Sequence, residues 1–208
     1  MKLYSTSRIG RRLGERFFFK AERDTTQKSA MMRRPYPPGM HGKRSRRTSS
    51  EFAMELKEKQ KLRYRFGLSD TALRRCVLAA GRVTGMTRHE ALVSLLERRF
   101  DNVVYRLGLA PSRRIARQLI SHGHFTVNDR QARIPSRLIK TGDRIAIRSQ
   151  SRTKAVFGNV AIRLKKHQPP PWLTLDAEAG TGRVTRQPSG NDLAELEGVG
   201  KAIEYYSR

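Results

Sequence analysis

Apolar positions in the first half of the chain recur at the spacing of amphipathic helices. Helix-favouring residues run from about 50 to 66, behind the capping-box pattern Thr48-Ser49-Ser50-Glu51, and end before a glycine. Either Ser69 or Asp70 can cap a second helix that ends at Gly81 and carries these apolar residues on one side: Leu73, Val77 and Ala80. We therefore predict a small helical domain in this part of the chain.

The clearest helical signal follows the capping box Thr87-Arg88-His89-Glu90. Apolar residues then keep helical spacing as far as Gly108: Leu92, Leu95, Leu96, Phe100, Val103 and Leu107. This regular spacing predicts one continuous helix from the capping box to Gly108.

A shorter segment after Pro111 combines an apolar and a basic face. Ser112 can cap a helix there, and Gly123 can end it. The apolar face consists of Ile115, Ala116, Leu119 and Ile120. The opposite face consists mostly of Arg113, Arg114, Arg117 and Ser121. Such a helix can dock on a sheet through one face and present donors to a phosphate backbone through the other. An ordinary solvated face is the alternative interpretation.

The pattern changes from helical to alternating after Gly123. Short antiparallel strands are predicted around these apolar residues: Phe125, Val127, Ile134, Ile145 and Ile147. Turns are predicted at Asn128-Asp129-Arg130-Gln131 and at Lys140-Thr141-Gly142-Asp143.

The last third of the chain mixes helical and strand-like segments. Residues 152–166 have a helical pattern, which the run Pro169-Pro170-Pro171 ends. Trp172-Leu173-Thr174-Leu175 is typical of a strand entering a hairpin toward Arg183-Val184-Thr185. A short helix is predicted around Ala202 to Tyr206. The order of helices, helix pair and strands predicts an α+β fold.

The net charge of the chain indicates what kind of partner it binds. The chain carries 44 Lys and Arg against 18 Asp and Glu, a formal net charge of +26. Such an excess opposes compaction unless a polyanion neutralises it. Arginine outnumbers lysine, and its planar guanidinium suits phosphates, base edges and base stacking. The composition therefore predicts a nucleic-acid partner.

Few residues could support metal, cofactor or catalytic chemistry. The single cysteine, Cys76, lies in an apolar run, and the five histidines are scattered along the chain. The one close pair, His122 and His124, is better explained by RNA contact or local capping than by metal binding. Phosphate-loop and hydrolase motifs are absent from the sequence. We therefore expect no enzyme, no metal, no cofactor and no small-molecule substrate.

Membrane association is not expected either. No apolar stretch is long enough to span a bilayer, and the first residues lack the hydrophobic region of a signal peptide. The sequence therefore predicts a soluble, intracellular protein.

Residues 1–48 combine basic, aromatic and turn-forming residues. In the segment from Arg33 to Gly42, prolines restrict the backbone and glycines free it, which predicts an ordered loop or an arm that orders on binding. The stretch Lys43-Arg44-Ser45-Arg46-Arg47 could be a solvated tail, but the adjoining turn residues favour RNA contact. Phe17-Phe18-Phe19 is better explained as a hydrophobic anchor than as a base-stacking platform.

The segments Leu95–Gly108 and Ser112–Asn128 closely resemble the compact RNA-binding domain of the bacterial small-subunit ribosomal protein four family. The resemblance covers nearly the whole length through further motifs: Pro38–Gly42, Leu56–Arg63, Pro171–Leu173 and Ile203–Ser207. The central module also occurs in pseudouridine synthases, tyrosyl-tRNA synthetases and a heat-shock RNA-binding protein, so the flanking motifs are what discriminate. Some family members bind zinc through four N-terminal cysteines, whereas residues 1–48 contain none, which implies the form without zinc.

The resemblance implies a structural constituent of the small ribosomal subunit. Such a protein binds the 5′ domain of 16S rRNA, nucleates assembly of the subunit body and influences translational accuracy together with ribosomal proteins five and twelve. It lies in the cytoplasm, in the ribosome, among small-subunit proteins that include ribosomal protein five. Two alternatives use the same module: an RNA-modification enzyme, which needs a separate catalytic domain, and a stress-linked RNA-binding factor acting on stalled ribosomes.

The expected organisation combines these readings. We expect a basic N-terminal arm over residues 1–44 and a helical domain over 45–90, onto which 189–208 packs back. An inserted α+β domain over 91–188 is expected to pack a helix pair on a short antiparallel sheet. Its RNA-binding module occupies about 97–160.

The candidate RNA contacts come from the arm, the first long helix and the module. The arm supplies Arg33, Arg34, Tyr36, His41, Lys43, Arg44, Arg46 and Arg47. The helix supplies Lys57, Lys59, Lys61 and Arg63. The module supplies Arg98, Arg99, Asn102, Arg106, Ser112, Arg113, Arg114, Arg117, Gln118, His122, His124, Asn128, Arg130 and Arg133. Binding through these groups should weaken steeply with salt.

Overall fold

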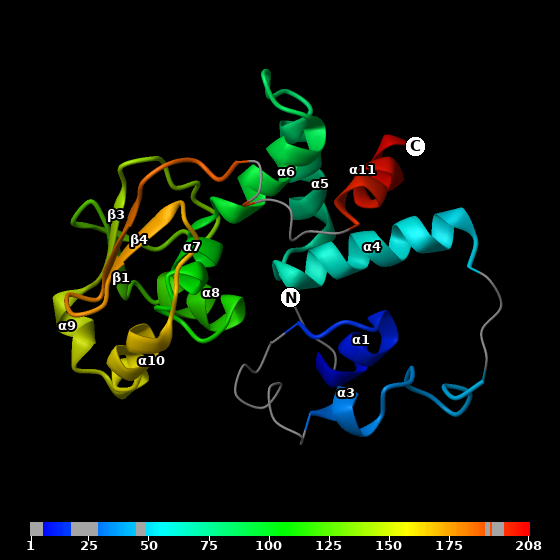
Figure 1. Ribbon diagram of the computed structural model, residues 1–208, viewed down its shortest axis with the longest axis horizontal. Coiled ribbons are helices and arrows are strands. Elements are labelled where there is room, and N and C mark those ends of the chain that lie inside the picture. Colours follow the sequence, from blue (N-terminus) through cyan, green and yellow to red (C-terminus); the bar gives the residue numbers. More distant parts are fainter. Residues whose placement is uncertain (1–5, 18–28, 45–48, 190–191, 193–197) are drawn as a thin grey trace. The chain divides into compact units, whose positions relative to one another are not determined.

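A computed structural model of the protein describes residues 6–17, 29–44, 49–189, 192 and 198–208. The chain divides into two compact units, and Figure 1 shows the helices of the first and the helices and sheet of the second. Unit 1 comprises Met1–Arg82 and Leu196–Arg208, and unit 2 comprises Val83–Glu195.

The regular secondary structure described in unit 1 is helical, and turns and loops connect the helices. Its helices are α1 (Thr6–Leu13), α3 (Ala30–Arg33), α4 (Glu51–Arg65), α5 (Asp70–Ala80) and α11 (Val199–Ser207). Serines cap the two longest, because Ser50 Oγ accepts a hydrogen bond from Ala53 N at 3.3 Å and Ser69 Oγ accepts one from Ala72 N at 3.2 Å. The helices predicted near 50–66, between Ser69 and Gly81, and at the C-terminal end are confirmed. Helices α1 and α3 were not predicted.

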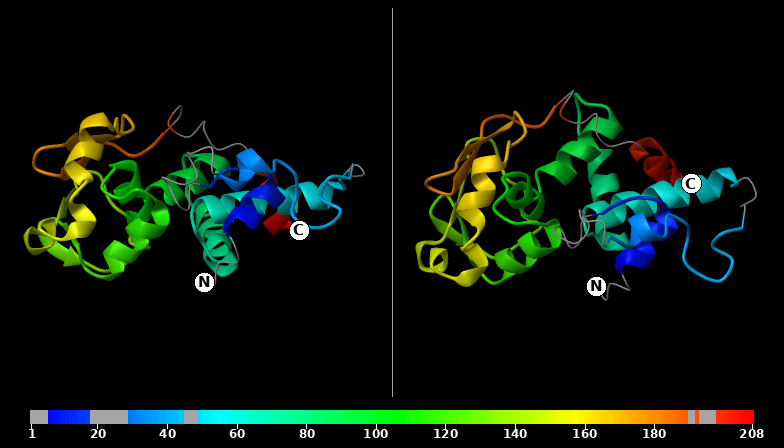
Figure 2. Two further views of the ribbon diagram at one scale, coloured as in Figure 1. Left: turned by 90° about the horizontal axis from the view of Figure 1, so that it is seen from below. Right: turned by 60° about the horizontal axis from the view of Figure 1, so that its bottom comes forward.

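Helix α11 packs along α4, and the right-hand view of Figure 2 shows the two helices side by side. Lys59 of α4 is 4% exposed, and its Nζ lies 2.8 Å from Asp70 Oδ1 and 4.2 Å from the centre of the Tyr205 ring. The Tyr206 hydroxyl donates a hydrogen bond to the same carboxylate at 3.2 Å. The hydrogen bond from Lys59 outweighs burial and holds the pKa of Asp70 below its ordinary value. The C-terminal segment therefore completes the helical domain, as predicted.

Unit 2 does not contain the single long helix predicted after the capping box. The capping box is present, but the helix is divided into α6 (Arg88–Glu97) and α7 (Phe100–Arg106). Between them Arg99 has an extended backbone, with φ −62° and ψ 138°. Phe100 N then donates to Arg137 O at 2.9 Å instead of to a carbonyl one turn earlier. The prediction of one continuous helix is therefore wrong. The hydrogen bond that divides the helix comes from a distant loop, so the local spacing of apolar residues gives no sign of it.

A five-stranded antiparallel sheet follows the helix pair, in the order β2-β1-β3-β5-β4. Its strands are β1 (Phe125–Val127), β2 (Arg130–Ala132), β3 (Arg144–Ile147), β4 (Leu173–Asp176) and β5 (Thr181–Val184). Helices α7 and α8 (Arg113–Ser121) share one core with it. Gly182 of β5 lies so close to α7 that an added Cβ would be 2.5 Å from Leu107 Cδ1. The α+β fold with a helix pair on a short antiparallel sheet is confirmed.

Two strand details differ from the prediction. The first hairpin turns on two residues only, Asn128 and Asp129, whose φ angles of 51° and 62° suit a tight hairpin turn. Arg130 and Gln131, expected in the turn, therefore begin β2. Ile134, expected in a strand, is 63% exposed in the loop that follows.

The helix predicted over 152–166 is also interrupted. The structure has three short pieces: α9 (Ser149–Arg152), the 3₁₀ turn η1 (Ala155–Phe157) and α10 (Val160–Lys166). Phe157, Val160 and Leu164 all reach the core of unit 2. Gly158 and Asn159 separate the last two pieces, so the chain changes direction while keeping these side chains buried.

Candidate RNA interface

Helix α8 presents the basic face that the sequence predicts. Ser112 Oγ accepts a hydrogen bond from Ile115 N at 3.3 Å and so begins the helix. One side of the helix is buried in the core through Ala116, Leu119 and Ile120. The opposite side exposes Arg114, Arg117 and Gln118. Guanidinium and amide donors held on a packed helix suit the phosphate oxygens of an RNA backbone.

A buried hydrogen-bond network supports the start of α8. Glu97 is 2% exposed, and its carboxylate accepts hydrogen bonds from Arg106 Nε at 3.0 Å, Arg106 Nη2 at 2.9 Å and Asn102 Nδ2 at 2.8 Å. Asn102 Oδ1 accepts one from Arg113 Nε at 2.7 Å, and the Arg113 guanidinium lies 4.5 Å from the centre of the Tyr105 ring. Burial alone raises the pKa of Glu97, but the hydrogen bond and charge of Arg106 outweigh it and leave that pKa lowered. The ionised carboxylate therefore fixes Arg113 through Asn102.

A second buried carboxylate lies beneath the same face. Asp101 is 3% exposed and accepts hydrogen bonds from Arg99 Nε at 3.1 Å and Arg99 Nη2 at 2.8 Å. Arg117 Nη1 lies 3.9 Å from Asp101 Oδ2 while its side chain stays 46% exposed. Arg99, Asn102 and Ser112, all proposed from the sequence as RNA contacts, are at most 5% exposed and are engaged inside the protein. They lie beneath the basic face and not on it.

The two histidines at the end of α8 lie together. The rings of His122 and His124 stack with centres 6.2 Å apart, and His124 Nδ1 is 3.0 Å from Ser151 Oγ. Burial, followed by the charges of Lys154 and His122, lowers the pKa of His124. His122 is exposed and His124 is half-buried, so the pair extends the exposed surface of α8 toward β1.

The first hairpin brings further cations to unit 2. Arg130 and Arg133 are exposed, on β2 and just after it. Asn128 instead closes the hairpin, because its Nδ2 donates to Asp143 Oδ1 at 2.7 Å and its Oδ1 accepts from Arg144 N at 2.9 Å. Half-buried Arg98 donates from Nε to Ile139 O at 3.2 Å.

The arm in unit 1 is shaped by a residue that the sequence analysis missed. Arg11 Nε donates to the carbonyls of Arg34 and Tyr36, each at 3.0 Å, and its guanidinium lies 5.0 Å from the centre of the Tyr36 ring. Lys43 Nζ approaches the same ring at 5.5 Å. No local pattern connects α1 to this arm, so only the tertiary structure reveals the role of Arg11.

The other predicted contacts of the arm are mostly exposed. The exposed side chains are Arg33, Arg34, His41, Lys43 and Arg44, and Tyr36 is half-buried. Gly42 is required by the fold, because an added Cβ would be 2.0 Å from Pro37 O. Arg46, Arg47, Phe18 and Phe19 lie outside the described residues. Phe17 lies with its ring centre 6.0 Å from that of Tyr64.

The four basic residues proposed on α4 do not share one environment. Lys57 is exposed, whereas Lys59 is buried against Asp70. Lys61 Nζ lies 2.7 Å from Glu58 Oε1, and the Arg63 guanidinium lies 4.5 Å from the centre of the Tyr64 ring. The structure therefore directs three of the four toward partners within unit 1.

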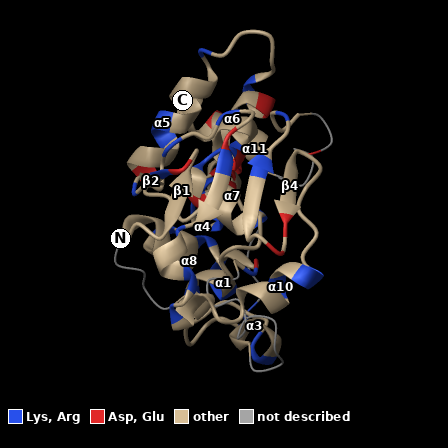
Figure 3. Cartoon of the chain, turned by 90° about the vertical axis from the view of Figure 1, so that its left-hand side faces the viewer, with Lys and Arg blue, Asp and Glu red and all other residues tan. Residues whose placement is uncertain are grey.

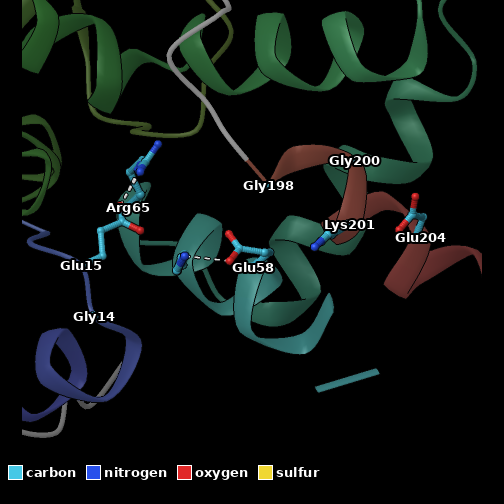
Figure 4. Close-up of a pocket in the computed structure, with 9 residues that line it drawn as sticks. Gly14, Glu15, Glu58, Arg65, Gly198, Gly200, Lys201 and Glu204 are labelled. Carbon is cyan, nitrogen blue, oxygen red and sulfur yellow. Dashed lines mark hydrogen bonds and ion pairs between the residues drawn. The ribbon is translucent and has the colours of Figure 1, made fainter. Parts of the chain in front are cut away.

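A polar pocket of about 650 Å³ in unit 1 lies beside α4 and α11 (Figure 4). Arg65 Nε donates to Glu15 Oε1 at 2.8 Å, and Glu58 pairs with Lys61. Lys201 also lines it. Because carboxylates alternate with cations around this pocket, it does not favour RNA phosphates as the basic face of α8 does.

Comparison with known proteins accounts for both units. Residues 98–145 match the family described as the S4 domain, and residues 2–97 match the one described as the ribosomal protein S4/S9 N-terminal domain. The small ribosomal subunit protein uS4 of Thermus thermophilus is 44% identical over 201 residues, which cover 97% of this chain and 96% of the relative. The uS4 protein of Syntrophomonas wolfei is 43% identical over 204 residues, 98% of this chain and 97% of the relative.

The chain belongs to the uS4 family of small ribosomal subunit proteins. The resemblance read from the sequence is thereby confirmed. As a member of this family the chain is a structural ribosomal protein with an RNA-binding S4 domain, and not an enzyme. Its partners are those of such a protein, ribosomal RNA and the ribosome.

The described residues add two observations on other chemistry. Among them no three or more His, Cys, Asp or Glu side chains gather in a way that could hold a metal ion. No helix in the described ranges is long and apolar enough to cross a membrane.

Proposed function

We propose that the chain is a primary binder of the 5′ domain of 16S rRNA, that it nucleates assembly of the body of the small subunit, and that it contributes to translational accuracy. One observation carries the proposal. Helix α8 is held on the core by its apolar side and exposes Arg114, Arg117 and Gln118 on the other, in a chain of net charge +26. Charge captures the RNA, and the shape of this face orients it.

The individual contacts divide by burial. The groups proposed to touch RNA directly are taken from the exposed or half-exposed ones: Arg33, Arg34, Tyr36, His41, Lys43, Arg44, Lys57, Arg98, Arg106, Arg113, Arg114, Arg117, Gln118, His122, His124, Arg130 and Arg133. Lys61, Arg63 and Asn128 are exposed or half-exposed too, and they remain proposed contacts from the sequence although they pair with Glu58, Tyr64 and Asp143 inside the protein. Arg99, Asn102 and Ser112 are proposed to position them, because their polar groups are already engaged inside unit 2. Arg46 and Arg47 remain proposed contacts from the sequence alone.

The domain limits expected from the sequence also remain a proposal. In it, residues 1–44 form the arm, 45–90 with 189–208 form the helical domain, and 91–188 form the α+β domain. The support is that helix α11 packs on α4, within unit 1, and that the sheet and α8 share one core, within unit 2.

The test is binding of the purified chain to the 5′ domain of 16S rRNA and to a folded RNA of equal length, across a salt series. We expect a tight complex with the 5′ domain that survives moderate salt, and weaker, more salt-sensitive binding to the control RNA. Equal affinities and equal salt slopes for both RNAs would contradict the proposal, because the chain would then bind RNA only as a nonspecific polycation.

The proposed place among small-subunit proteins needs its own measurement. We expect the chain to be stoichiometric in mature small subunits and to cross-link there to ribosomal protein five. A stress-linked factor would be substoichiometric in mature subunits, and finding that would contradict the assembly role.

A further inference from the structure

The sheet of unit 2 has a second face, directed away from the core. Along β3, Ile145 and Ile147 enter the core, so Arg144 and Ala146 point to the other side. Ala146 lies opposite Thr126 of β1 and Thr181 of β5, which makes a floor of small residues across three strands. Figure 3 looks onto this sheet, and basic residues, in blue, lie on its strands.

Arginines surround a cleft of about 470 Å³ on this face. Six of the residues that line it carry donors: Thr126, Gln131, Arg144, Arg148, Ser149 and Arg152. Asp129 of the hairpin turn supplies the only carboxylate among the lining residues, against three guanidinium groups. The cleft therefore has a local excess of positive charge.

The fold holds these arginines in place. Arg148 follows β3 directly, and its backbone N donates to His124 O at 2.9 Å. Arg152 ends α9, and its Nη2 donates to Ala179 O at 2.8 Å. The backbone of Arg148 is thus held by the sheet, and that of Arg152 by a short helix.

The register adds an independent observation. Arg144 of β3 lies directly opposite Arg183 of β5, so two like charges share one face of neighbouring strands. Like charges in this arrangement destabilise a sheet. An anion bound over the pair would offset that repulsion, so this register favours an anionic ligand on this face of the sheet, although Arg183 itself does not line the cleft.

We propose that this cleft, the sheet-face cleft, binds the phosphodiester backbone of a second RNA segment, apart from the segment bound by α8. The inference rests on the proposed function and deepens it: unit 2 holds two RNA segments together, one on each side of its sheet. Arg144, Arg148 and Arg152 were not among the contacts proposed from the sequence. Contacts of this kind position RNA without reading its bases.

RNA is favoured over an acidic protein segment because no exposed large hydrophobic side chain that the structure describes lines the cleft. Protein interfaces are centred on buried aromatic or aliphatic anchors. Among the described residues of unit 2, the exposed large hydrophobic ones are Val83, Met86, Ile134, Leu138, Val156 and Ile162. None of them lines the cleft, whereas guanidinium, hydroxyl and amide donors do.

The experiment compares two triple variants of the full chain that lose the same charge. The first is Arg144→Gln with Arg148→Gln and Arg152→Gln. The matched control is Arg74→Gln with Arg75→Gln and Arg82→Gln, three exposed arginines of unit 1 outside every proposed contact. Binding to the 5′ domain of 16S rRNA is measured across a salt series.

We expect the sheet-face variant to bind roughly tenfold or more weakly and its salt slope to fall by about two to three, while the control keeps the wild-type slope. A triple Arg→Lys variant at the same positions retains the charge, so it is expected to keep most of the slope and separates a binding defect from a folding defect. Equal behaviour of the sheet-face variant and the control would overturn the inference.

A photo-crosslinker at Ser149 then identifies the occupant in reconstituted small subunits. Cross-links to an rRNA segment different from the one that cross-links to α8 support the proposal. Cross-links to a protein, or to the same RNA segment as α8, overturn it. The proposed function fails separately, when the wild-type chain itself shows no preference for the 5′ domain.

Discussion

Helices α4 and α8 both carry basic residues, but the fold uses those residues differently. On α4, Lys59 is buried against Asp70 and two tyrosine rings, and Lys61 pairs with Glu58. On α8, Arg114 and Arg117 are exposed above an apolar side that anchors the helix. A basic residue in a highly cationic chain is therefore not evidence of RNA contact until its burial and its partners are known.

The energetics follow the same division. Burying a charge costs several kcal/mol unless a partner and hydrogen bonds compensate. Lys59 and Glu97 meet that condition with partners inside the protein, so removing either partner is expected to destabilise the fold. An exposed arginine contributes little to stability, and its guanidinium is available to bind a ligand. Separating stability from RNA affinity by mutation therefore tests the comparison.

The largest loss of stability is expected from Glu97→Ala. The change leaves Arg106 and Asn102 without their shared acceptor in a buried site, and breaking such a pair costs about 3 kcal/mol. Hydrogen exchange of the α7 and α8 peptides, read by mass spectrometry, measures the loss in unit 2. RNA affinity should fall too, since Arg113 loses its support. Unchanged protection would show that the network does not hold α8.

Lys59→Ala is expected to cost about 2 kcal/mol, less than the loss of Glu97 because its partner Asp70 is half-exposed. Helix α11 should exchange its amides faster, while α8 should not change. Lys59→Met keeps the packing volume and leaves Asp70 with access to water, so it should recover most of the loss. If both variants weaken RNA binding at unchanged stability, Lys59 is an RNA contact and the contrast between the helices is wrong.

A pH dependence is expected from Glu97, whose folded pKa lies below its ordinary value of 4.5. With the folded pKa lowered, ionised Glu97 stabilises unit 2 fully above its unfolded pKa, and this stability is lost as the pH falls through the folded pKa. Glu97→Gln removes that contribution while an amide oxygen still accepts from Asn102. Unfolding of wild type and variant between pH 6 and about 3 should converge toward acid. Parallel curves would contradict the assignment.

The smallest stability effect is expected from Arg114→Gln combined with Arg117→Gln, within about 0.5 kcal/mol of wild type. Its effect on RNA is the opposite, because the salt slope of binding to the 5′ domain should fall by about two. Arg74→Gln with Arg75→Gln is the matched control and should change neither quantity. A large drop in stability with an unchanged salt slope would show that Arg114 and Arg117 act inside the protein, as Lys59 and Lys61 of α4 do.

Much of the fold could be predicted because the signals are local. Serine caps, the capping box at Thr87 and the apolar face of α8 depend on residues within a few positions of one another. The division of the long helix at Arg99 could not be predicted, because the loop that reaches Phe100 lies far along the chain. The two-residue turn at Asn128 and Asp129 was missed for a smaller reason, since the polar residues after it are equally typical of turns.

The sequence predicted a set of candidate RNA contacts, and the structure shows which of them are exposed and which are buried. Arg114 and Arg117 are exposed as the helical periodicity predicts. Asn102 and Arg99 come from the preceding segment and turn inward, because the carboxylates of Glu97 and Asp101 accept their hydrogen bonds there. Periodicity reports which side of a helix is apolar, and it cannot report a polar network buried between two helices.

The sequence by itself determined the family, the α+β class, the places of most helices and strands, and the need for a polyanionic partner. Charge, caps and apolar spacing are properties of neighbouring residues, so they can be read along the chain. Only the tertiary structure decided which cations face solvent: it buried Lys59, set Arg11 against Tyr36 and gathered Arg144, Arg148 and Arg152 on one face of a sheet. These outcomes depend on contacts between distant segments, which arise only when the strands pair and the helices pack.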